Sequence, residues 1–184
     1  EDAPTERSER VRLDVSKKTV VTSLRYVDPR MFGRFLVATE DIPEWTSLGP
    51  DPLVDRVDGP LLGRVLGEKK RSIKEVLMDQ TVIAGIGNIQ ATEALWRARI
   101  HPRARPCDLS ARQLGALARA LRWTIDRTLS LEEGPEIQYV EDAGAKNPFL
   151  VYGHDDEPCP RCADLLLRIV LGGRGTVYCP TCQA

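Results

Sequence analysis

The chain ends in Cys159-Pro-Arg-Cys162, sixteen further residues, and then Cys179-Pro-Thr-Cys182. Two Cys-x-x-Cys pairs at this separation can place four thiolates tetrahedrally around one Zn²⁺, each pair supplying two neighbouring ligands. Because four thiolates leave no coordination position for water, the pattern predicts one structural zinc ion. Two disulfides in a secreted domain are the alternative, which we disfavour because the sequence shows no signal peptide.

The residues between the two cysteine pairs are typical of a β-hairpin. Leu165–Leu171 predicts one strand, and Thr176–Tyr178 begins its partner. Gly172-Gly-Arg-Gly175 predicts the turn between them, since glycine adopts positive φ without steric cost. The sequence therefore indicates a zinc-clamped hairpin with Arg174 at its tip.

Charge is distributed unevenly along the chain, although its net charge is only −1. Residues 64–127 hold 13 basic and 6 acidic side chains, whereas residues 1–63 hold 9 and 12, and residues 128–184 hold 4 and 9. This basic block favours a polyanionic partner, although a solvated helix face explains the charge equally well. The sequence contains no long apolar run and no targeting segment, so we expect a cytoplasmic protein without membrane association.

The first third of the chain carries strand patterns. Residues 10–15 alternate between polar and apolar side chains, and Val20–Val27 is rich in β-formers, which predicts a pair joined through a turn at residues 16–18. Phe32–Val37 is a candidate third strand. The Pro- and Gly-rich stretch Leu48-Gly-Pro-Asp-Pro-Leu53 then predicts a domain linker.

Helices are expected from about residue 61 to residue 132. Ser72-Ile-Lys-Glu75 is a capping box that opens a short helix through Met78. Asn88 is expected to be the N-cap of a helix over Ile89–Ala98. A longer helix should begin after Ser110, with Gln113 completing a second capping box. Its buried face is predicted to consist of Leu114, Leu117, Leu121, Ile125 and Leu129.

Gly85-Ile-Gly-Asn88 lies between two of these helices, inside the basic block. Its glycines allow a ligand to approach the backbone closely, and the helix that follows presents free N–H groups at the positive end of its dipole. Alone, this motif would indicate an ordinary tight turn. Because Lys69-Lys70-Arg71 and Lys74 precede it, we expect a clamp for a DNA phosphate.

Several of these stretches together resemble the formamidopyrimidine-DNA glycosylase and endonuclease VIII family. Ile73–Gln80, Ile83–Ile89, Glu93–Trp96 and His101-Pro102 are similar to its helix–two-turn–helix. Val151-Tyr-Gly153, Gly173-Arg174 and Cys182-Gln183 are similar to its C-terminal zinc finger, and Tyr26–Gly33 and Leu48–Leu53 to the end of its N-terminal β-domain and the linker.

The resemblance implies an α+β fold with three parts. Residues 1–53 would form the remnant of an N-terminal β-sandwich and the linker, residues 54–148 the helix–two-turn–helix DNA-binding domain, and residues 149–184 the zinc-bound β-hairpin. The implied function is base-excision repair, in which an oxidised base is flipped out of the duplex, its glycosidic bond is cut and the abasic strand is nicked. The implied partner is double-stranded DNA with oxidised bases or abasic sites, bound in the cytoplasm at the nucleoid.

The resemblance also assigns roles to particular residues. Asn88 and Lys74 would hold DNA phosphates beside the lesion, and Lys70 and Gly87 would be further DNA contacts. Arg174 would clamp the phosphates that flank the flipped nucleotide and assist the later elimination step. By the same resemblance, Arg30 would fill the space opposite the orphaned base and Phe32 would wedge the base stack, with a core position on an edge strand as the alternative for Phe32.

The start of the chain departs from the family pattern. The family's nucleophile is an N-terminal proline followed by a glutamate, whereas this sequence opens Glu1-Asp2-Ala3-Pro4. We therefore expect the chain alone to bind damaged DNA but to be catalytically defective, and to be monomeric unless an incomplete β-domain drives association. A truncated homologue that recognises damaged DNA without cutting it is an alternative. A zinc-ribbon module for RNA or protein is another, but it does not explain Asn88, Lys74 or Arg30.

Overall fold

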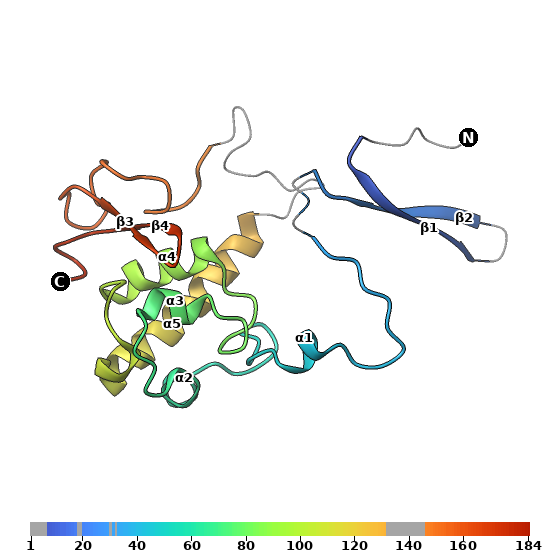
Figure 1. Cartoon of the computed structure of the whole chain (residues 1–184). Coiled ribbons are helices and arrows are strands. Elements are labelled where there is room, and N and C mark those ends of the chain that lie inside the picture. The colour runs from blue at the N-terminus through green and yellow to red at the C-terminus, as the bar shows by residue number, and fades with distance from the viewer. Residues whose placement is uncertain (1–6, 18–19, 30, 32, 132–145) are drawn as a thin grey trace. The chain divides into compact units, whose positions relative to one another are not determined.

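The computed structural model describes residues 7–17, 20–29, 31, 33–131 and 146–184. Within these residues the chain has the predicted α+β composition and divides into two compact units (Figure 1). We call residues 1–42 the hairpin unit and residues 43–184 the helical unit. The elements in chain order are β1 (Glu9–Lys17), β2 (Val20–Val27), α1 (Pro43–Thr46), α2 (Gly59–Leu66), α3 (Ile73–Leu77), α4 (Asn88–Ala98), the 3-10 helix η1 (Pro106–Asp108), α5 (Ala111–Leu131), β3 (Leu167–Leu171) and β4 (Arg174–Tyr178).

The hairpin unit contains the predicted strand pair. β1 and β2 are antiparallel from Lys17 opposite Val20 to Glu9 opposite Val27, with an irregularity between Glu9 and Val11. The expected third strand is wrong for its described residues 33–37, which form no strand. The amide of Gly33 instead donates to Asp28 Oδ2 over 2.7 Å.

The core of the helical unit lies between α2, α3, α4 and α5. Leu117 and Leu121 of α5 are fully buried, as their spacing predicts, whereas Leu129 is about half exposed because the apolar contact ends before the last turn. The other fully buried aliphatic side chains of this core include Leu62, Leu66, Ile73, Leu77, Ile83, Ile86, Leu95 and Ile100. None of the described helices is long and apolar enough to cross a membrane.

Two capping boxes fix where helices begin. Ser72 accepts from the amide of Glu75, whose carboxylate accepts from the amide of Ser72, so α3 begins as predicted. Ser110 and Gln113 make the same reciprocal pair before α5. Each pair satisfies amides that a helix start otherwise leaves without partners.

The stretch predicted as a linker, residues 48–53, belongs to the helical unit. The amide of Gly49 donates to the carbonyl of Gln80 over 2.8 Å, and the amide of Ala84 donates to the carbonyl of Pro50 over 3.1 Å. A side chain at Gly49 would collide with the backbone of Val82, 2.4 Å from the position of a Cβ atom. The two compact units accordingly separate between Ile42 and Pro43, while the three-part division with boundaries at residues 53/54 and 148/149 stays a proposal.

The C-terminal residues 146–184, which we call the zinc finger, pack on α4. Its apolar side chains join Trp96 of α4 in a second buried cluster, made of Trp96, Val151, Leu166 and Val177 with Cys159 and Cys179. The turn of the finger's hairpin is shorter than predicted: only Gly172 and Gly173 lie between β3 and β4, with φ of 54° and 73°. Arg174 is therefore the first residue of β4, paired with Leu171.

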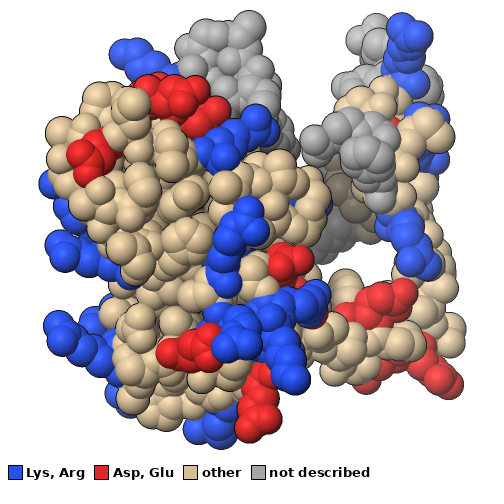
Figure 2. Space-filling model, turned by 60° about the vertical axis from the view of Figure 1, so that its left-hand side comes forward, with Lys and Arg blue, Asp and Glu red and all other residues tan. Residues whose placement is uncertain are grey.

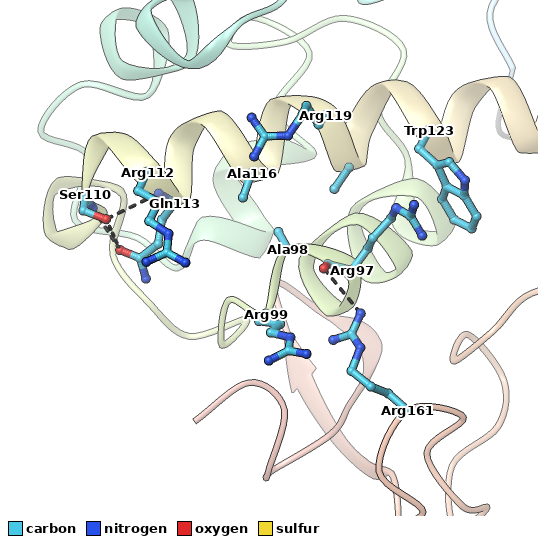
Figure 3. A pocket seen from close by; sticks show the side chains of 11 residues that line it. Arg97, Ala98, Arg99, Ser110, Arg112, Gln113, Ala116, Arg119, Trp123 and Arg161 are labelled. Carbon is cyan, nitrogen blue, oxygen red and sulfur yellow. Dashed lines mark hydrogen bonds between the residues drawn. The ribbon is translucent and has the colours of Figure 1, made fainter.

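Charged side chains on the visible face of the helical unit are mainly basic (Figure 2). Arg71 forms an ion pair with Asp79 over 2.7 Å, and Arg122 forms one with Asp126 over 2.9 Å. On α4, Arg97 instead lies over the ring of Trp123 in α5, 3.8 Å from its centroid (Figure 3). The predicted basic block thus lies largely on the surface of one folded unit.

Candidate nucleic-acid interface and metal centre

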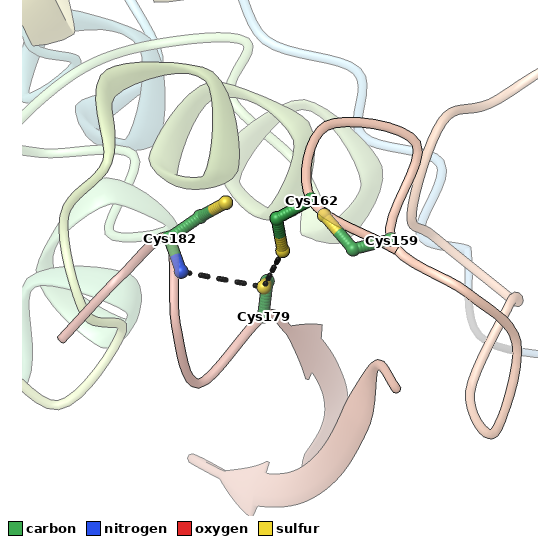
Figure 4. Close-up of side chains that lie close together, drawn as sticks. All are labelled: Cys159, Cys162, Cys179 and Cys182. Atoms are coloured by element: carbon green, nitrogen blue, oxygen red, sulfur yellow. Dashed lines mark hydrogen bonds between the residues drawn. The ribbon is translucent and has the colours of Figure 1, made fainter. Parts of the chain in front are cut away.

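The four predicted zinc ligands lie together. The Sγ atoms of Cys159, Cys162, Cys179 and Cys182 are all within 4.8 Å of one another, and those of Cys162 and Cys179 are 3.4 Å apart (Figure 4). Zinc bound tetrahedrally by sulfur at about 2.3 Å separates its ligands by about 3.8 Å, so the cluster fits the ion. The finger holds one structural zinc. Cys107 is exposed and lies outside the cluster.

N–H groups around the cluster donate to its sulfur atoms. The indole Nε1 of Trp96 lies 3.4 Å from Cys159 Sγ, and the amide of Cys182 lies 3.3 Å from Cys179 Sγ. N–H donors of this kind stabilise thiolates and orient them toward a metal. The metal site is thereby tied to α4 through Trp96.

Gln183 connects the second cysteine pair to the end of α4. It is buried, its Oε1 accepts from the amide of Cys179 over 2.9 Å, and its Nε2 donates to the carbonyl of Ile100 over 2.8 Å. The sequence marks Gln183 only through the family resemblance, because both contacts depend on the packing of the finger.

Glu93 is a supporting residue of the site that its sequence position alone did not reveal. It is 2% exposed, and its carboxylate accepts from the amides of Leu150, Val151 and Tyr152 over 2.8 to 3.0 Å. These bonds anchor the first residues of the finger on α4. One sequence signal for this role was available: Glu93 is an acidic residue on the face of α4 that also carries apolar residues. A carboxylate buried on such a face needs hydrogen-bond donors.

Asn88 begins α4 differently from the sequence prediction. The N-cap is Gly87, no side chain caps the helix, and Asn88 is its first residue. The Asn88 Nδ2 instead donates to the carbonyl of Gly175 on β4 over 3.2 Å. The prediction of an Asn88 cap is wrong because this partner lies 87 residues away in the sequence. Asn88 Oδ1 is buried without a hydrogen-bonding partner among the described residues.

Lys74 lies in the interior, not near the surface as expected. Its side chain is fully buried, and Nζ donates to the carbonyl of Asn88 over 2.7 Å and to Thr92 Oγ1 over 2.5 Å. Burial lowers the pKa of Lys74 to about 7. The expectation failed because the face of α3 that carries Lys74 packs against the start of α4. Lys74 therefore holds the backbone at Asn88 from the inside.

The turn between β3 and β4 also lies beside the start of a helix. A side chain at Gly172 would lie 3.1 Å from Glu75 Cγ, so the turn rests beside the first turn of α3. Arg174 is exposed, and the next residue, Gly175, accepts the bond from Asn88.

The other predicted DNA contacts lie as follows. Lys70 is exposed between α2 and α3, and Gly87 is half-buried. Arg30 and Phe32 lie outside the described residues, so their roles stay predictions.

The fold and this site define a class of protein. It is a helix–two-turn–helix protein in which helix α4 begins against the hairpin of a four-cysteine zinc finger. The comparisons agree with this class. The model of the formamidopyrimidine-DNA glycosylase H2TH domain matches residues 48–138, and the model of the zinc finger found in FPG and IleRS matches residues 156–184.

Curated relatives identify the family. The formamidopyrimidine-DNA glycosylase of Lactobacillus acidophilus is 36% identical over 193 aligned residues, which cover 100% of this chain and 68% of the relative. That of Gluconobacter oxydans is 38% identical over 85% of this chain and 60% of its own length. This chain belongs to the formamidopyrimidine-DNA glycosylase/endonuclease VIII family, and it spans about 60% to 68% of the length of these relatives.

Solved structures show the same relationship. The MutM (Fpg) protein of Thermus thermophilus has a TM-score of 0.78 and 35% identity, covering 98% of this chain and 70% of the solved chain. The Lactococcus lactis Fpg in complex with DNA containing an abasic site has a TM-score of 0.80 and 30% identity, covering 99% and 68%. The fold predicted from the motifs is therefore confirmed.

Proposed function

We propose that this chain acts in DNA base-excision repair by binding duplex DNA that contains oxidised bases or abasic sites. The partner named for the Lactococcus lactis relative, DNA containing an abasic site, supports this choice of ligand. The protein binds DNA as a monomer, in the cytoplasm at the nucleoid. The family's reaction is that of a DNA glycosylase with abasic-site lyase activity, and Arg174 is placed to assist the elimination step of that reaction.

The observation that carries the proposal is the hydrogen bond between Asn88 Nδ2 and the carbonyl of Gly175. It brings the start of α4 next to Arg174 at the tip of the zinc finger. The amides of the first turn of α4 have no side-chain cap, and Asn88 Nδ2 retains a second N–H. A guanidinium, an amide donor and a helix N-terminus together are suited to adjacent phosphates of one DNA strand.

The remaining predicted contacts divide into two groups. Lys70 and Gly87 contribute to phosphate binding directly, Lys70 from the exposed loop before α3 and Gly87 through its backbone. Lys74 acts through another residue: its bonds to the carbonyl of Asn88 and to Thr92 position the turn. Lys74 is thus a positioning residue for the phosphate clamp.

Binding to an abasic-site duplex at several salt concentrations tests the clamp. We expect Arg174→Ala to weaken binding and to reduce the slope of log K against log salt by about 0.9, because one phosphate charge is no longer neutralised. Asn88→Ala should weaken binding with little change in slope, because asparagine is neutral. Arg122→Ala, which removes an exposed arginine paired with Asp126, is the control and should bind like the original chain. Equal affinity of all four proteins would refute the clamp.

A further inference from the structure

A second basic site lies at the other end of α4. Its cavity has a volume of about 980 Å³ and lies between the C-terminal end of α4, the first three turns of α5 and the first cysteine pair (Figure 3). Five arginines and no acidic residue line it: Arg97, Arg99, Arg112, Arg119 and Arg161. Such a set of like charges is mutually repulsive unless an anion neutralises it.

The cavity is separate from the proposed DNA-phosphate clamp. α4 begins at Asn88 and ends at Ala98, and 11 helical residues span about 16 Å. Asn88 lies at the first end, and Ala98 with its neighbours Arg97 and Arg99 lines the cavity at the second. None of the predicted DNA contacts among the described residues lines the cavity.

Three of the guanidinium groups have no acidic partner among the residues that the structure describes. No carboxylate in the described part of the chain forms an ion pair with Arg99, Arg112 or Arg119. Nearby arginines outside the cavity behave differently: Arg122 pairs with Asp126, and Arg105 with Asp108. The charge in the cavity is therefore available to a ligand.

The other two arginines are held in place by aromatic rings. Arg97 lies 3.8 Å from the centroid of Trp123, and Arg161 lies 4.2 Å from that of Trp96. Arg161 also donates to the carbonyls of Trp96 and Arg97, over 3.0 and 3.4 Å. Stacked guanidiniums lose less side-chain freedom when a ligand arrives, so this wall of the cavity is preorganised.

We propose that this cavity binds a phosphate-chain anion of nucleotide size. Guanidinium groups bind phosphate oxygens in bidentate pairs, and five of them match an anion that carries several charges. The cavity volume is at the upper end of the range of about 300 to 1,000 Å³ typical of small-ligand sites. Both inorganic tripolyphosphate and a nucleoside triphosphate present this chemistry, and neither depends on the proposed DNA-binding function.

Isothermal titration of the full chain with tripolyphosphate and, separately, with ATP tests the proposal. We expect one saturable site with a dissociation constant below about 1 mM for at least one of the two. Binding of tripolyphosphate alone would assign the site to the phosphate chain, and tighter binding of ATP would add contacts to the base or sugar. Saturable binding of neither compound, with or without binding of a single-stranded oligonucleotide, would overturn the proposal.

Matched variants separate a built site from general charge attraction. Arg112→Gln combined with Arg119→Gln should weaken binding about tenfold or more, because charge-assisted bonds are lost. Arg122→Gln changes an arginine of the same helix that lies outside the cavity and should have less than a twofold effect. Equal losses in the two proteins would overturn the proposal.

Abasic-duplex binding provides the second readout. The double variant should bind the duplex within twofold of the original chain, whereas Asn88→Ala should not, so failure of one site is distinguishable from failure of the other. If the double variant lost duplex binding in parallel with tripolyphosphate binding, the cavity would belong to the DNA surface and the proposal would be wrong.

Discussion

The hairpin unit and the helical unit differ in how far their apolar side chains are buried. β1 and β2 are paired along most of their length, yet no apolar residue in the described part of the hairpin unit is buried, and Leu13, Val15 and Leu24 are 41% to 63% exposed. In the helical unit, α2 to α5 surround one contiguous core, and the finger adds a second. The difference is in apolar burial and not in backbone pairing.

This contrast shows where the stability of the described chain comes from. A two-stranded hairpin is marginal in water because its backbone bonds replace equally good bonds to water. Each fully buried leucine or isoleucine in the helical unit contributes about 1.5 to 3 kcal/mol relative to an exposed one. We therefore expect the helical unit to unfold as a cooperative body and the hairpin to open independently at much lower cost.

Removal of zinc should have the largest effect. It should unfold the zinc finger while the core of α2 to α5 stays folded. Structural zinc contributes about 10 to 16 kcal/mol in zinc-finger peptides, and here it holds the cysteines that pack around Trp96. Cys159→Ser or a strong chelator should leave the finger without amide protection, while α2 to α5 keep their separate core. Hydrogen exchange read residue by residue measures both parts.

The control for zinc removal is Cys107→Ser, which changes an exposed thiol outside the cluster. It should leave metal content at one zinc per chain and exchange unchanged. A zinc-free protein with undiminished protection in β3 and β4 would show that the finger is held by packing alone.

A pair of leucine substitutions tests the contrast between the two units directly. Leu121→Ala creates a cavity in the helical core and should lower the free energy of unfolding by about 2 to 5 kcal/mol. Leu24→Ala, at a position that is 63% exposed, should change it by less than about 0.5 kcal/mol. Urea unfolding followed by helical circular dichroism measures both.

Hydrogen exchange supplies a second measurement on the unsubstituted chain. Amides of β1 and β2 should exchange far faster than those of α5. Equal protection in the two units of a monomer, or a large effect of Leu24→Ala, would show that the hairpin is coupled to the helical core.

Features specified within a few residues could be predicted from the sequence. The capping boxes at Ser72 and Ser110 depend on residues three positions apart, and the apolar stripe of α5 follows from helical periodicity. The zinc ligands are likewise two local pairs, and the glycines at positions 172 and 173 adopt the positive φ that a tight hairpin turn requires.

Features that depend on distant partners could not be predicted. The Asn88 side chain turns to Gly175 and not to its own helix, so local capping rules gave the wrong role. The burial of Lys74 depends on how α3 packs against α4, and the role of Glu93 depends on three amides near residue 151. The sequence could thus indicate which residues belong to the site. Which of them contact DNA directly and which position other residues could be inferred only from the fold.

The last expected effect concerns Lys74, which makes the stability of the helical unit depend on pH. Its pKa is about 7 in the folded chain and near the ordinary 10.5 when unfolded, so between these values the unfolded chain binds more protons. Stability should therefore rise with pH from about 7 to about 10, by up to about 1.4 kcal/mol per pH unit from this residue.

Substitution of Lys74 by methionine should remove this slope. Lys74→Met keeps an unbranched, buried side chain but cannot titrate. It removes the bonds that Nζ donates to the carbonyl of Asn88 and to Thr92 Oγ1, while the hydroxyl of Thr92 still donates to the carbonyl of Asn88. Urea unfolding of both proteins at pH 7, 8 and 9 should show the original chain gaining stability relative to the variant as pH rises. Hydrogen exchange of the β1 and β2 amides should show no such difference, because these strands belong to a compact unit separate from the one that contains Lys74. Parallel pH profiles for the two proteins would mean that Lys74 stays charged in the folded chain, and that its ammonium is reached by water or by an anion at the turn.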